Sequence, residues 1–307
     1  MFEAMGRGEL TSLYVIGENP AQSEADATKA LHLLSGLDHL VVQDIFLTAT
    51  AELAHVVFPA AASWCESEGT VTNSERRVQR VRQALTPPGR ARDELAIISD
   101  LAARLGHDWG QPTADEVWNE LRRLSPNHAG MSYKRLEEHG GLQWPCYDET
   151  HPGTLFLHGR LWETPVQGPK APFHAVDHDP PVDRTDEQYP IRLTTGRRLD
   201  SYNTGVQTVG YRSPLRRGET LDLSPEDGMR YGVSDGEWVR VSSRRGSILA
   251  PVRFDPGLRP GLAFMTLHFQ DEVATNLLTI DAIDPKSGTA EFKATAIRLD
   301  RVAPEPD

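Results

Sequence analysis

The change of hydrophobic periodicity along the chain limits its fold more than any other feature. The first half alternates helical patterns with three short β-branched runs, at residues 13–17, 40–46 and 56–58. Strand, helix and strand at this spacing predict a βαβ unit with a parallel sheet. The second half instead carries five strand-like segments, near residues 191–195, 238–242, 247–254, 262–268 and 293–299. Several strands around one short helix, which begins at Ser224-Pro225 and ends near Gly232, predict a closed β-barrel.

We therefore predict three parts: an α/β domain over residues 1–145, a connecting segment over 146–187 and a barrel domain over 188–307. The connecting segment is rich in Pro and His and shows little periodicity. Residues 63–90 are polar and rich in turn-forming residues, which predicts turns in this segment.

Helix starts and turns can be placed within this frame. We predict helices over residues 93–105 and after a capping box at Thr113, and another that begins at Ser23. We expect Arg244 and Arg245 to lie exposed in a hairpin turn.

Net charge and cysteine count exclude several classes of protein. The chain has 32 basic and 44 acidic side chains, a formal charge of −12, which argues against nucleic acid and anionic membranes as partners. No stretch has the length of a membrane span and no secretory signal is visible, so we expect a cytoplasmic protein. Cys65 and Cys146 cannot form a four-cysteine site, and we expect both to be reduced.

Three polar segments that follow strands are candidates for ligand binding. There is no nucleotide-binding glycine motif, no nucleophile elbow and no histidine pair at metal-ligand spacing. The loop at residues 17–20 with Ser23 could hold phosphate or a nucleoside. The Gln43-Asp44 strand end could recognise a base, and Arg197 after a strand could bind a pyrophosphate. Each segment also has a purely structural interpretation. The loop at residues 17–20 is then a turn with a helix cap, Gln43 a polar strand end and Arg197 part of a solvated turn.

Collinear motifs carry a resemblance to a known family. They lie at residues 17–20 (GENP), 42–48 (VQDIFLT), 69–80 (GTVTNSERRVQR), 143–146 (QWPC), 195–198 (TGRR), 242–246 (SSRRG), 276–279 (NLLT) and 291–293 (EFK). In this order they resemble the C-terminal part of the molybdopterin oxidoreductases, specifically the catalytic (alpha) subunit of formate dehydrogenases. The resemblance implies a Rossmann-like α/β domain, incomplete at its N-terminus, followed by a double-psi β-barrel. It also implies a molybdenum or tungsten ion held by two pterin guanine dinucleotides, a cofactor that carries the redox chemistry.

The resemblance also implies cofactor-binding residues. In the α/β domain these are Gly17, Asn19, Ser23, Gln43, Ala60 and Asp93. The first three lie in a loop that contacts one guanine dinucleotide, the next two at strand ends lining that site, and Asp93 contacts the guanine. In the barrel domain the residues are Arg197, Asn203, Leu267, His268, Asn276, Phe292 and Lys293. Arg197 and Asn203 correspond to contacts with the pterin-pyrophosphate, and Phe292 stands where the family usually has Tyr.

The segments of the family that lie before this match hold the cysteines of a [4Fe–4S] cluster, the metal ligand and the formate-handling residues. No residue of this chain takes a catalytic or metal-ligating role, and we expect no formate oxidation by the chain alone. Its partners would be an N-terminal catalytic portion and electron-transfer subunits. Two alternatives are a stand-alone dinucleotide-binding module and a non-functional truncated remnant, and nitrate reductases share several motifs.

Overall fold

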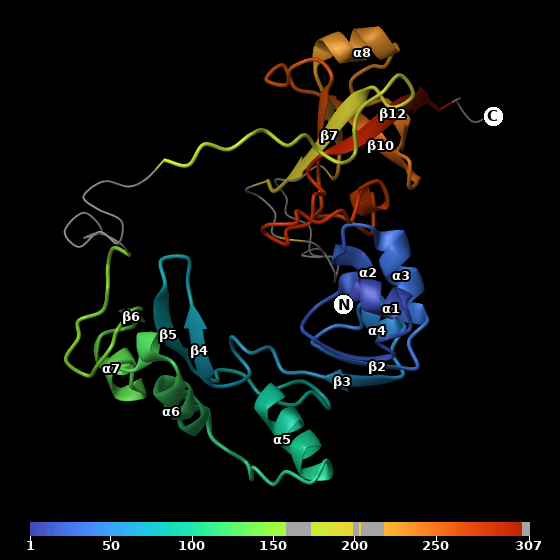
Figure 1. Ribbon diagram of the computed structural model, residues 1–307. Helices are drawn as coiled ribbons and strands as arrows, with labels where there is room; N and C mark the ends of the chain where they lie inside the picture. Colours follow the sequence, from blue (N-terminus) through green and yellow to red (C-terminus); the bar gives the residue numbers. More distant parts are fainter. Residues whose placement is uncertain (158–172, 199–202, 204–217, 303–307) are drawn as a thin grey trace. The chain divides into compact units, whose positions relative to one another are not determined.

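The computed structural model describes residues 1–157, 173–198, 203 and 218–302 (Figure 1). The chain folds as two compact units. Unit 1 comprises Met1–Val42, Phe46–Val57 and His178–Asp307, and unit 2 comprises Gln43–Ile45 and Phe58–Asp177. The division into residues 1–145, 146–187 and 188–307 remains a prediction, and residues 158–172 of its connecting segment lie outside the described residues.

The N-terminal part of unit 1 is built on a three-stranded sheet. Its strands follow the order β1 (Ser12–Ile16), β2 (His39–Asp44) and β3 (Val56–Pro59), which confirms the three β-branched runs as strands. The last residues of β2 and β3 belong to unit 2. Four short helices occupy the connections: α1 (Phe2–Gly6), α2 (Pro20–Ser23), α3 (Ala27–Ser35) and α4 (Ala49–Glu52). Leu34, Leu40 and Val42 are buried in the core that these elements share.

Helix α3 begins later than predicted. Asp26, not Ser23, is its N-cap, and the Asp26 carboxylate accepts a hydrogen bond from the Lys29 backbone N–H at 3.0 Å. Pro20 begins the separate helix α2, because its fixed φ suits the first helical position. Ser23 is the last residue of α2 and donates its backbone N–H to the Asn19 carbonyl.

Unit 2 contains a sheet where the sequence predicted turns. Strand β4 (Gly69–Thr72) pairs antiparallel with β5 (Arg77–Val81), and β5 pairs antiparallel with β6 (Leu142–Gln143). The turn-rich reading of residues 63–90 is therefore wrong for these strands. The local sequence could not reveal them, because the partner that helps to bury Val78 comes from a segment more than 60 residues further along.

Two helices of unit 2, α5 (Glu94–Arg104) and α6 (Ala114–Leu124), agree with the sequence prediction. Helix α7 (Tyr133–Glu138) and the 3-10 turn η1 (Pro126–His128) were not predicted. The Asp93 carboxylate caps α5, and Thr113 with Glu116 forms the predicted capping box on α6. Trp118 packs with Met131 and Leu136 in a buried core of this unit.

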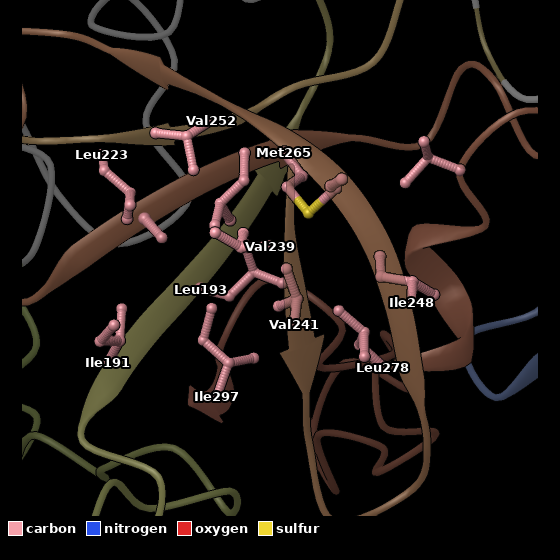
Figure 2. Packing of buried hydrophobic residues seen from close by; sticks show 14 of the residues in the cluster. Ile191, Leu193, Leu223, Val239, Val241, Ile248, Val252, Met265, Leu278 and Ile297 are labelled. Atoms are coloured by element: carbon pink, nitrogen blue, oxygen red, sulfur yellow. The ribbon is translucent and has the colours of Figure 1, made fainter. Parts of the chain in front are cut away.

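The C-terminal part of unit 1 is a closed barrel, as predicted. Its strands are β7 (Ile191–Gly196), β8 (Leu221–Leu223), β9 (Trp238–Ser242), β10 (Ser247–Phe254), β11 (Leu262–Thr266) and β12 (Thr295–Arg301). They close in the order β10-β8-β11-β7-β12-β9, with β7 and β11 parallel and β9 and β10 forming an antiparallel hairpin. Figure 2 shows the aliphatic side chains that fill the barrel, including the fully buried Leu193, Val241 and Met265.

Two short helices complete the barrel region. Helix α8 (Pro225–Tyr231) begins at the N-cap Ser224 and ends at Gly232, whose φ of 65° is left-handed. The 3-10 turn η2 (Thr275–Leu277) follows β11. In the part of the chain that the structure describes, no helix has the length and apolar character needed to cross a bilayer.

The basic turn between β9 and β10 corrects a second prediction. Arg244 and Arg245 both form ion pairs with Asp183, whose side chain is only 2 % exposed. The Arg245 side chain is itself 16 % exposed, so the expectation of two exposed charges is wrong. Asp183 lies in the predicted connecting segment, some 60 residues before the turn, and no local pattern could have paired the two.

Candidate functional site

The loop after β1 carries the first three predicted site residues. Gly17 is exposed, has a φ of 63°, and no atom lies within 4 Å of where a Cβ would be. Asn19 holds the loop against α4: its Oδ1 accepts hydrogen bonds from the Thr50 backbone N–H at 3.1 Å and the Thr50 hydroxyl at 2.7 Å. Its Nδ2 donates to Gln22, which leaves one amide N–H for a ligand. The exposed Ser23 hydroxyl makes no hydrogen bond to the described residues.

Asn276 joins this loop region to the segment after β11. The Asn276 side chain is 2 % exposed, and its Nδ2 donates to the carbonyls of Gln22 at 2.6 Å and Glu24 at 2.8 Å. Thr279 makes a third link, from its hydroxyl to the Ala25 carbonyl. Among the described residues, the buried Asn276 Oδ1 has no hydrogen-bond partner. Two predicted site segments about 250 residues apart therefore lie together.

The Glu24 carboxyl beside this junction is electrostatically perturbed. Burial raises its pKa above the ordinary value, and the Asp281 and Glu18 carboxylates raise it further. Asp281 also forms an ion pair with Lys29 on α3. The junction therefore carries an excess of negative charge.

The two arginines after β7 have different roles. Arg198 forms an ion pair with Asp222 at 2.7 Å, and Arg253 contacts the same carboxylate. Asp222 is 1 % exposed, so Arg198 belongs to the barrel wall. Arg197 is exposed, and its guanidinium makes no ion pair or hydrogen bond within the described part of the chain. Arg197 is thus the guanidinium at this loop that is open to an anion.

His268 organises the loop that carries Arg197. The imidazole is 1 % exposed; its Nε2 accepts the Arg198 backbone N–H at 3.1 Å, and its Nδ1 lies 2.6 Å from the Asn203 carbonyl oxygen. A backbone N–H can only donate and a carbonyl can only accept, so these contacts assign a neutral ring with its proton on Nδ1. Both ring nitrogens therefore bond within the chain. Asn203 itself is exposed, with a φ of 49°.

The other predicted residues of the barrel, Phe292, Lys293 and Leu267, differ in their exposure to solvent. The Phe292 carbonyl accepts a hydrogen bond from the Thr195 hydroxyl on β7 at 3.2 Å, and the Phe292 side chain is half-buried. Lys293 is exposed, and Leu267 is half-buried directly before His268.

Unit 2 brings together the other predicted residues. Gln43 is fully buried at the end of β2. Ala60 donates its backbone N–H to the Asp44 carbonyl and forms a parallel bridge with Arg92. Asp93, the next residue, accepts hydrogen bonds from the Leu95 and Ala96 backbone N–H groups as the cap of α5. The three positions therefore gather where two strands end and a helix begins.

The carboxylates at this edge influence one another. Burial raises the pKa of Glu94, and the charges of Asp93 and Asp44 raise it further. An added cation or a hydrogen-bond donor would relieve this repulsion.

Sequence reasoning missed the buried acids that support the barrel loops. Glu219 is 2 % exposed and accepts hydrogen bonds from the backbone and hydroxyl of Thr266, two residues before His268. Asp222 holds Arg198 beside the loop. The available signal was an acid inside an apolar strand pattern, Leu-Asp-Leu at residues 221–223, which predicts a buried partner of opposite charge.

Nothing in the described residues offers a metal site of the protein's own. No group of three or more His, Cys, Asp or Glu side chains is placed to hold an ion there. Cys65 and Cys146 are free thiols, and Cys146 is buried. The site is therefore one of loops, amides and a guanidinium, which suits a polar organic ligand with an anionic group.

Comparison with known proteins defines the class. Residues 1–104 match the family described as molybdopterin oxidoreductase, and residues 191–296 match the molydopterin dinucleotide binding domain. The fold is similar to acetylene hydratase from Pelobacter acetylenicus, with a TM-score of 0.71 and 20% identity over 98% of this chain and 46% of that chain. The chain belongs to the molybdopterin oxidoreductases.

Within that family the chain is similar to alpha subunits of formate dehydrogenases and to nitrate reductases. It is 42% identical to the "F420-dependent formate dehydrogenase 2 subunit alpha" of Methanococcus maripaludis, over 94% of this chain and 43% of the relative. It is also 35% identical to the "Assimilatory nitrate reductase catalytic subunit" of Bacillus subtilis, over 97% of this chain and 43% of the relative. The chain thus spans less than half the length of these relatives.

The family's cofactor is molybdopterin guanine dinucleotide with molybdenum or tungsten, and the structure offers groups that fit it. A dinucleotide carries a pyrophosphate, which a guanidinium binds better than any other side chain. Arg197 is such a group without a partner in the described residues. The buried Asn276 Oδ1 lacks a donor there, and buried acceptors are normally satisfied. The open backbone at Gly17 admits close approach of a ligand.

Proposed function

We propose that this chain supplies dinucleotide-binding surfaces of a formate dehydrogenase-like enzyme that oxidises formate to carbon dioxide. The observation that carries the proposal is the union of two motifs distant in sequence. The loop at residues 17–23 is joined by Asn276 to the segment after β11, and His268 in that segment holds the loop with Arg197. The assigned dinucleotide residues of unit 1 thus rest on one supporting segment.

The chemistry of each assigned residue suits it to a different part of the dinucleotide. Arg197 binds the pyrophosphate, and Asn203, in the same loop, offers its amide to the neighbouring part of the ligand. Gly17, the remaining Asn19 N–H and the Ser23 hydroxyl bind a polar portion of a dinucleotide. Phe292 offers a ring face and Lys293 a cation to a pterin, and Leu267 provides an apolar contact. His268 positions the Arg197 loop and does not itself touch the ligand.

In unit 2, the edge formed by Gln43, Ala60 and Asp93 is suited to a guanine base. A carboxylate accepts two parallel hydrogen bonds from the N1–H and amino group of guanine, and the methyl side chain of Ala60 leaves room for a flat ring. The Asp93 carboxylate caps α5 through Oδ1, so Oδ2 stays available for one of these two hydrogen bonds. We assign these residues to a Rossmann-like α/β domain and the barrel to the double-psi type, with the domain division at 1–145, 146–187 and 188–307.

The reaction requires more than this chain contains. When bound, the cofactor supplies the two-electron chemistry. This chain's residues bind and orient it, whereas the metal ligand and iron–sulfur cluster implied by the resemblance would come from an N-terminal catalytic portion, with electrons passing to further subunits. Formate is favoured over nitrate because the 42% identity to a formate dehydrogenase alpha subunit exceeds the 35% identity to a nitrate reductase.

The test is a measurement of metal, pterin and released GMP in the chain purified alone and with an N-terminal portion of a formate dehydrogenase. Stoichiometric metal and two GMP per complex, with formate-dependent dye reduction, would support the proposal. Nitrate-dependent oxidation of a reduced dye, without formate activity, would mean that the substrate is nitrate and not formate. Cofactor on the lone chain, without activity in any complex, would favour a binding module, and no cofactor in either preparation would overturn the proposal.

Arg197→Gln tests the assigned pyrophosphate contact. The matched control is Arg123→Gln, which removes an exposed arginine from α6 that has no ion pair within the described residues. A charge-assisted contact of this kind contributes about 1.5–3 kcal/mol. GMP content should therefore fall in Arg197→Gln and stay unchanged in Arg123→Gln. Equal GMP content in the two variants would refute the role of Arg197.

A further inference from the structure

A pocket lies in unit 2, beside the strand end and helix start that carry Ala60 and Asp93. Its volume is about 240 Å³, and it is formed by the end of β3, the following loop and α5. Phe58, Ile97 and Leu101 form apolar walls. Neither Gln43, Ala60 nor Asp93 lines it. The lining residues therefore differ from those assigned to the guanine, although Pro59 and Arg92 directly precede Ala60 and Asp93.

The rim of this pocket is cationic. Arg90, Arg92 and Arg104 line it together with a single acid, Asp100. Arg92 forms an ion pair with Asp100 at 2.7 Å, so these two charges compensate each other. Arg90 and Arg104 are exposed, and neither makes an ion pair or hydrogen bond within the described residues. Two guanidinium groups are thus left without a counter-charge beside an apolar hollow.

The surrounding sequence strengthens the local field. Residues 76–92 contain six arginines and no acid, although the whole chain carries a charge of −12. Arg80 and Arg82 in this run are neutralised by Glu68 and Glu137. Arg90 has no such partner in the part of the chain described. Although Asp93 and Glu94 follow this run directly, Arg90 and Arg104 leave uncompensated positive charge at the pocket, which attracts small anions.

We propose that this pocket binds a small organic anion, with one carboxylate or phosphate group on a single ring or a short apolar chain. The volume is below the roughly 300–1,000 Å³ of drug-sized sites and above that of the ~150 Å³ cavity that holds benzene, so it suits a one-ring body. The ring packs on Phe58, Ile97 and Leu101. The anionic group pairs with Arg90 and Arg104, and the Arg92–Asp100 pair closes one side.

Ligand-observed NMR on the full chain tests this site with four probes. Benzoate and phenyl phosphate combine the ring with either anion, benzyl alcohol keeps the ring without the charge, and inorganic phosphate keeps the charge without the ring. Arg90→Gln and Arg104→Gln remove the cations individually, and Arg90→Lys and Arg104→Lys retain the charge. Arg123→Gln on α6 is again the control, and thermal unfolding verifies that each variant is folded.

We expect saturable binding of at least one ring anion, weakened about tenfold or more by each glutamine variant. The lysine variants should recover part of this loss, and Arg123→Gln should bind as the unaltered chain does. Preference for benzoate or phenyl phosphate identifies the anionic group. The proposal is overturned if neither ring anion binds saturably, if benzyl alcohol or inorganic phosphate binds as tightly as the ring anions, or if Arg104→Gln and Arg123→Gln have equal affinities.

Discussion

Replacing Asn276 by Ala should destabilise unit 1 by about 1–2 kcal/mol. The change removes two hydrogen bonds from a side chain that is 2 % exposed, each with a net contribution of about 1 kcal/mol, and leaves two carbonyls without this donor. The loss is offset by about 1 kcal/mol, because the change also removes the buried Oδ1 that lacks a partner in the described residues. For a unit of this size, the midpoint of thermal unfolding should fall by about 3–6 °C.

Asn276→Asp distinguishes the hydrogen bonds from simple packing. The carboxylate has nearly the same shape as the amide but has no N–H groups, so it would face the Gln22 and Glu24 carbonyls as a second acceptor. We expect a larger loss of stability than in Asn276→Ala at pH 7. Hydrogen exchange of the α3 amides should also become faster, since this junction attaches the segment before α3.

The control is Gln188→Ala, which removes an exposed amide side chain from the same unit and should change the unfolding free energy by less than about 0.5 kcal/mol. Thermal melts followed by circular dichroism and urea titrations measure all three variants. If Asn276→Ala and Gln188→Ala melt within 1 °C of each other, or if Asn276→Asp is no less stable than Asn276→Ala, the two hydrogen bonds do not hold this junction.

Three further predictions concern charge and turn geometry. Burial raises the pKa of Glu24, so the stability contributed by its neutral form is present at low pH and is lost as the pH rises through that pKa. In urea titrations, Glu24→Gln should therefore be more stable than the unaltered chain at pH 7 but not at pH 3. A stability difference that does not depend on pH would contradict this prediction. Asp183→Asn leaves Arg244 and Arg245 without their buried counter-charge and should cost about 3 kcal/mol in urea unfolding; a loss below 1 kcal/mol would mean that the cluster is not coupled to the fold. Gly232→Ala forces a φ of 65° on a residue with a Cβ and should lower the free energy of unfolding by about 1 kcal/mol. Gly232→Asn should lower it less, since Asn tolerates that conformation. Equal thermal midpoints for the two variants would argue against backbone strain at this position.

The elements that the sequence predicted correctly are those specified by local chemistry. Five of the six barrel strands were predicted from their alternating polarity, whereas the short β8 was not. Helix α8 starts at Ser224-Pro225 and ends at Gly232, and α6 starts at a capping box. Each of these signals acts over a few residues, so it is readable in one dimension. Strands β4 and β5 were missed because their pairing with β6 overrides a polar, turn-like composition.

For the candidate site, the sequence by itself determined the chemical types and their order: a glycine loop after β1, an arginine after β7, and an asparagine after β11. Only the tertiary structure decided which of these groups are free. It committed Arg198 to Asp222 and left Arg197 exposed. It also used both ring nitrogens of His268 inside the chain and placed Asn276 against the loop before α3. The physical reason is that a hydrogen bond or ion pair depends on distance in space, and the partners here are tens to hundreds of residues apart in the sequence.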